Sequence, residues 1–115
     1  MSTDKDAIEK VLGFVLPDDA TVLLIERESG IDDMLRAKVE MSRVSFMSLA
    51  PRLPVPMTSM TRGPGRLSAD KGDWNPRGTP GVKSGQVALA AGRYLNIGVA
   101  ESSERVTLFV LEHGT

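Results

Sequence analysis

The chain has 115 residues, of which 41% are hydrophobic and 25% charged, with no cysteine and a net charge of −1. This composition excludes disulfides, thiolate metal sites and disorder of the whole chain. No stretch approaches the roughly 18 apolar residues of a spanning helix, so we expect one soluble domain over residues 1–115, without a membrane span.

The first half of the chain predicts a helix followed by a β-hairpin. The helix lies between Thr3, a capping residue, and Gly13, which ends it. Its apolar residues recur at helical spacing: Ala7, Ile8, Val11 and Leu12. Over residues 21–41 apolar and polar side chains alternate with a period of two, which indicates two strands. Gly30, Asp32 and Asp33 supply the turn between them.

A second short helix is predicted after Ser42, which can cap it, and Pro51 requires it to end near Leu49. Residues 54–85 are rich in Pro and Gly and predict a long loop. Residues 86–91 indicate a further short strand or a bulged strand start, and alternation over 95–99 and 106–110 predicts a second hairpin. The expected fold is α+β: an antiparallel sheet of four to five strands built from two hairpins, with the two helices on one face.

Several short patterns follow a layout found in small bacterial proteins. They are Leu16-Pro17-x-x-Ala20 before a strand, Gly30-Ile31-Asp32 in a turn, Phe46 in a short helix, Trp74-x-Pro76 in the loop and Arg93-x-Leu95 entering the last hairpin. In these residues, which extend over most of the chain, the sequence resembles small uncharacterised bacterial α+β proteins, some of which are lipoproteins. The resemblance implies an α+β fold and a bacterial source, and it brings no established activity with it.

The strongest functional signal is the basic character of the loop, because residues 52–83 carry six Lys or Arg against two Asp or Glu. The candidate binding residues are Arg62, Arg66, Trp74 and Arg77. Arginines next to one aromatic residue predict a non-enzymatic module that binds a protein partner through this loop. A nucleic-acid partner is less favoured, because the pI is near 5.8. An alternative interpretation packs Trp74 on the sheet as buried area.

An enzyme is the rival class. Asp32 and Asp33, with Arg36 or Arg93, suggest a metal-assisted activity, although turn chemistry explains the same aspartates. His113, the single histidine, lies near the chain end in a segment expected to fray, which argues against a His-dependent nucleophilic site. No phosphate-loop pattern is present and no cofactor is expected.

Three further expectations concern assembly, methionines and location. A homodimer through an exposed sheet edge is the structural alternative, with strand 105–111 as the expected edge. Core positions are expected for Met34, Met41 and Met47, and a contact surface for Met57 and Met60. The polar, acidic start of the sequence predicts a cytoplasmic chain, with export left open for a product whose signal peptide has been removed.

Overall fold

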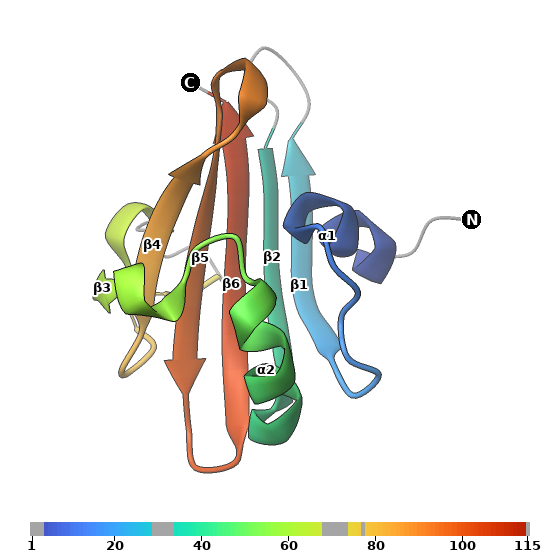
Figure 1. The fold of residues 1–115 in the computed structure, drawn as a ribbon, viewed down its shortest axis with the longest axis vertical. Coiled ribbons are helices and arrows are strands. Elements are labelled where there is room, and N and C mark those ends of the chain that lie inside the picture. The colour runs from blue at the N-terminus through green and yellow to red at the C-terminus, as the bar shows by residue number, and fades with distance from the viewer. Residues whose placement is uncertain (1–3, 29–33, 68–73, 77, 115) are drawn as a thin grey trace.

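The computed structural model describes residues 4–28, 34–67, 74–76 and 78–114. Within these residues six strands form one antiparallel sheet in the order β1-β2-β6-β5-β4-β3, and two short α-helices lie on one face of it (Figure 1). The strands are β1 Thr21–Glu28, β2 Met34–Ser42, β3 Thr61–Arg62, β4 Lys83–Ala88, β5 Arg93–Glu101 and β6 Arg105–Gly114. The helices are α1 Asp4–Leu12 and α2 Arg43–Leu49, and the 3₁₀ turns are η1 Ala50–Arg52, η2 Met57–Ser59, η3 Gly65–Leu67 and η4 Ala90–Gly92. The α+β class is confirmed.

The end of α1 and the start of α2 lie where the sequence places their caps, and Thr3, the predicted cap of α1, lies outside the described residues. In α1, Ile8 and Leu12 are buried against the sheet, and Gly13 ends the helix with a φ of 87°. In α2, the Ser42 hydroxyl accepts the N–H of Ser45 at 3.2 Å, which satisfies one of the unpaired amides of the first turn. Local capping chemistry therefore fixes the end of α1 and the start of α2.

The prediction of four to five strands is wrong, because the sheet has six among the described residues. The additional strand, β3, is only two residues long and comes from the predicted loop: Thr61 pairs with Ser84 and Arg62 with Lys83. The expected short strand at 86–91 is shifted to residues 83–88 and pairs along its whole length with β5. A two-residue strand carries no periodicity, so its pairing depends on distant residues.

The expected edge strand 105–111 is also placed differently. It belongs to β6, which lies inside the sheet and pairs with β2 on one side and β5 on the other. The edges of the described sheet are β1 and β3. A dimer through a sheet edge would therefore use β1, β3 or residues 85–88 of β4, which β3 does not cover, and not β6.

Hydrophobic clusters lie on both faces of the sheet. On the helix-covered face, α1, α2 and the segment around Leu53 and Val55 pack on alternate residues of β2, β5 and β6. On the opposite face, Leu67, Trp74 and Val82 of the predicted loop pack on Phe109 and Leu111 of β6. Part of the loop therefore forms a third layer, which buries the second face of the central strands.

Candidate functional site

The basic hollow, which we define as the surface depression between Arg62–Pro64 and Thr79–Lys83, contains the first predicted binding residue. Its volume is about 500 Å³, and its described lining residues include no acidic side chain. Arg62 and Lys83 stand directly opposite each other across β3 and β4, and both are exposed. Within the described residues neither side chain forms an ion pair. Two like charges are thus held together at the rim of an open depression.

Backbone contacts hold the floor of this hollow in place. The chain turns after β3 at Gly63, whose φ of 102° suits a residue without a Cβ atom. The Gly63 amide donates to the carbonyl of Val82 at 2.8 Å, and the Ser84 hydroxyl donates to the carbonyl of Gly63 at 2.8 Å. The position of Arg62 relative to Lys83 is therefore set by ordered backbone.

Trp74, the second predicted binding residue, is fully buried. Its indole N–H donates to the carbonyl of Leu67 at 3.1 Å, and its ring meets Phe109 edge-on with centroids 5.3 Å apart. The Arg36 guanidinium lies 5.3 Å from the ring centroid. This geometry agrees with the alternative interpretation, in which Trp74 packs on the sheet. A ring enclosed in this way has no face on which a base could stack.

The remaining predicted residues are described only in part. The backbone of Arg66 belongs to η3, but its side chain and the whole of Arg77 lie outside the described residues, as do Asp32 and Asp33 of the hairpin turn. Among the side chains that the structure does describe, no three His, Asp or Glu residues gather as metal ligands would.

An apolar surface, which we call the α2 surface, was not predicted from the sequence. Val44 and Met47 lie on the outer side of α2 with 78% and 70% of their area exposed, and Val15 nearby in the fold is 74% exposed. A hollow of about 320 Å³ next to Met47 is lined by Ala50, Pro51, Leu53, Pro56, Met57 and Thr58. The methionine predictions are therefore partly wrong: Met47 is exposed and Met60 is buried.

A second unpredicted feature is the Arg93–Glu112 ion pair near one end of the sheet. The two residues lie diagonally across β5 and β6, and the Arg93 Nε and Nη2 groups both donate to Glu112 Oε1, with the Nε bond at 2.9 Å. Their side chains are 29% and 19% exposed and line a cavity of about 500 Å³. The sequence analysis named Arg93 only as a companion of Asp32 and Asp33.

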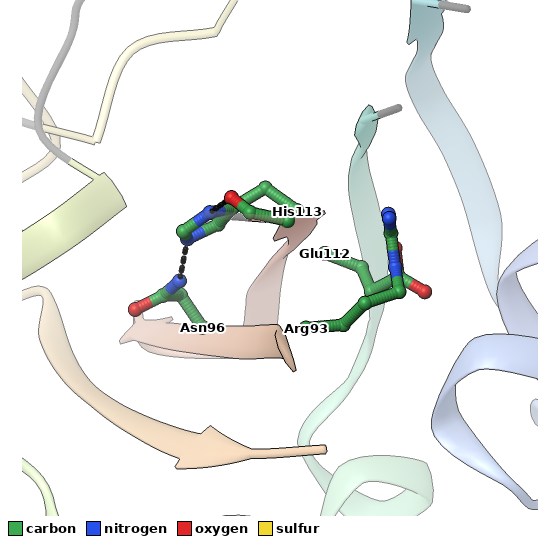
Figure 2. Close-up of polar contacts among 5 residues, drawn as sticks. Arg93, Asn96, Glu112 and His113 are labelled. Carbon is green, nitrogen blue, oxygen red and sulfur yellow. Dashed lines mark hydrogen bonds and ion pairs between the residues drawn. The ribbon is translucent and has the colours of Figure 1, made fainter. Parts of the chain in front are cut away.

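His113 lies on the other side of the same two strands (Figure 2). It does not occupy a frayed end: β6 extends to Gly114, and His113 stacks on Tyr94. The amide nitrogen of buried Asn96 donates to His113 Nε2 at 3.0 Å, so the ring proton is on Nδ1 and is donated to the Gly114 carbonyl at 2.9 Å. Both ring nitrogens of His113 are thus engaged in hydrogen bonds within the fold.

The structure thus defines a sheet-rich α+β protein with a basic hollow and an exposed apolar surface. In the described part of the chain, no helix is long and apolar enough to cross a membrane. Comparisons with protein-family models, with curated proteins and with solved structures found no match to this chain.

Proposed function

We propose that this protein is a non-enzymatic module that binds an acidic, partly apolar segment of a partner protein through the basic hollow and its surroundings. The observation that carries the proposal is the pairing of Arg62 with Lys83. Like charges directly opposite on neighbouring strands destabilise a sheet. A carboxylate bound between them would replace this repulsion with two attractions, so the pair favours an anionic partner.

Two observations favour a protein over a nucleic acid as the partner. Trp74 is buried, which removes the aromatic platform on which single-stranded nucleic acids stack. The exposed α2 surface provides apolar contacts, which protein interfaces use at their centres. The hollow beside Met47 is also close to β3 along the chain, because η2 joins β3 through Met60 alone. In this proposal, apolar groups of the partner segment contact the α2 surface and its acidic groups contact the basic hollow.

The proposal is tested with a fluorescein-labelled peptide of alternating Glu and Leu residues, and with a matched Gln and Leu peptide. Fluorescence anisotropy is expected to show that the acidic peptide binds more tightly, and that its affinity falls as salt is added. The variant R62E/K83E should weaken binding by roughly tenfold or more, which corresponds to about 1.4 kcal/mol.

The matched control is R43E/R105E, which changes net charge equally at exposed residues that do not line the basic hollow. It should bind the acidic peptide as the wild type does, apart from the general effect of net charge. Equal affinities for the two peptides, or equal losses in the two variants, would contradict the proposal.

A further inference from the structure

The end cavity, by which we mean the 500 Å³ cavity beside Arg93, lies between α1, the ends of β1 and β2, and the β4–β5 connection. Apolar side chains of Ala7, Val11, Leu35 and Leu89 form part of its lining. Its charged residues are Lys10, Arg27, Glu28, Arg93 and Glu112. A volume of this size, with apolar walls and a few polar groups, is typical of a small-molecule site.

The Arg93–Glu112 pair distinguishes this cavity from the adjoining core. Arg93 and Glu112 are half-buried, whereas the buried side chains of β5 and β6 on the helix-covered face are apolar: Leu95, Ile97, Val99, Val106, Leu108 and Val110. Removing a charged pair from water is costly, and apolar residues could have filled the same positions without that cost. The pair instead provides a polar wall that faces the cavity.

The charge balance of the rim determines the kind of ligand that fits. Arg93 and Glu112 neutralise each other, which leaves Lys10 and Arg27 against Glu28. All three of these rim residues are outside the ion pairs found among the described residues. Counted over its described lining residues, the cavity therefore combines an apolar wall with an excess of one positive charge.

We propose that the end cavity binds a small amphiphilic anion, namely a carboxylate with a short aliphatic chain. The carboxylate is held at the rim by Lys10 and Arg27, and the chain lies against Val11, Leu35 and Leu89. The site is separate from the basic hollow, because the two share no lining residue. It would add a small-molecule ligand to a protein whose proposed partner is a macromolecule.

The test measures binding of octanoate, octylammonium and 1-octanol to the full chain by isothermal titration calorimetry at neutral pH. The three probes share the same apolar body and differ in the charge of the head group. Octanoate is expected to bind at least about tenfold more tightly than octylammonium, which corresponds to about 1.4 kcal/mol. The variant K10A/R27A should lose about tenfold in octanoate affinity and little in octanol affinity, since it removes charge from exposed positions.

Two controls separate this proposal from the previous one. R62A/K83A should bind octanoate like the wild type, and amide NMR shifts on adding octanoate should concentrate near Ala7, Leu35 and Leu89. L89W should block all three probes by filling the cavity, and circular dichroism checks that the variant folds. Equal affinity for octanoate and octylammonium, no binding of octanoate, or unchanged octanoate affinity in K10A/R27A would overturn the inference.

Discussion

At the scale of single residues, Trp74 packs on the sheet, as one of its two interpretations from the sequence expects. Because it is buried and hydrogen-bonded to Leu67, we expect Trp74→Phe to destabilise the fold by about 1–3 kcal/mol, through the unpaired carbonyl that it leaves. Urea unfolding followed by circular dichroism measures the change. The folded variant should bind the acidic peptide as the wild type does.

Fluorescence of the wild type provides the matching observation. A fully buried indole should emit at short wavelength and resist quenching by acrylamide until the protein unfolds. If a folded Trp74→Phe variant lost peptide binding, Trp74 would contribute to binding, and the purely structural role given to it here would be wrong.

At the scale of elements, Asp19 links the turn before β1 to the start of α2. Its Oδ2 accepts the Ser42 amide at 3.1 Å, and hydrogen bonds from the Ser42 and Ser45 side chains lower the pKa of Asp19 from its ordinary value of 3.8. A lowered carboxyl pKa adds stability that is fully present above the unfolded-state pKa and is lost as the pH falls through the folded-state pKa. We therefore expect Asp19→Asn to be less stable than the wild type at pH 6, with the difference narrowing below about pH 4.

The measurement is the free energy of unfolding of both proteins in urea at several pH values. A difference between Asp19→Asn and the wild type that stays constant or widens toward low pH would contradict this account. Glu9→Gln serves as a comparison variant for Asp19→Asn. It removes a carboxylate that also accepts a backbone amide, that of Leu16, but this contact lies outside α2.

The order of the strands was harder to predict than their positions. Period-two alternation is a local signal, and it located β1, β2, β5 and β6. Strand order depends on distant partners, yet one signal was present: Leu108–Leu111 are consecutive apolar residues, all buried, as expected for a strand covered on both faces. The third layer that covers the second face comes from a loop without periodicity.

The residues that form the candidate sites were even harder to predict, because they come together only through the register of the paired strands. Arg93 and Glu112 are 19 residues apart in sequence and meet only because β5 and β6 pair as they do. The opposition of Arg62 and Lys83 likewise exists only once β3 has formed. By contrast, the basic composition of residues 52–83 was visible in the sequence, because charge is a property of composition and not of pairing.

At the scale of the whole molecule, the sheet edges bear on the homodimer alternative. β3 has two residues, and β1 has an irregularity between Val22 and Leu24 followed by the charged residues Glu26, Arg27 and Glu28. Short strands, bulges and charges all discourage pairing between edges. We therefore expect sedimentation equilibrium to give the mass of one chain across a wide concentration range.

A mass that rises with concentration would contradict this expectation, and two variants would then locate the contact. Leu23→Lys places a charge in the middle of the edge strand β1, where Leu23 is 46% exposed, and should abolish an edge-to-edge dimer. Met47→Ser removes the central apolar side chain of the α2 surface and should abolish a dimer formed there. Because the edges of the sheet carry protective features, any rise in mass with concentration should be reduced by Met47→Ser and not by Leu23→Lys.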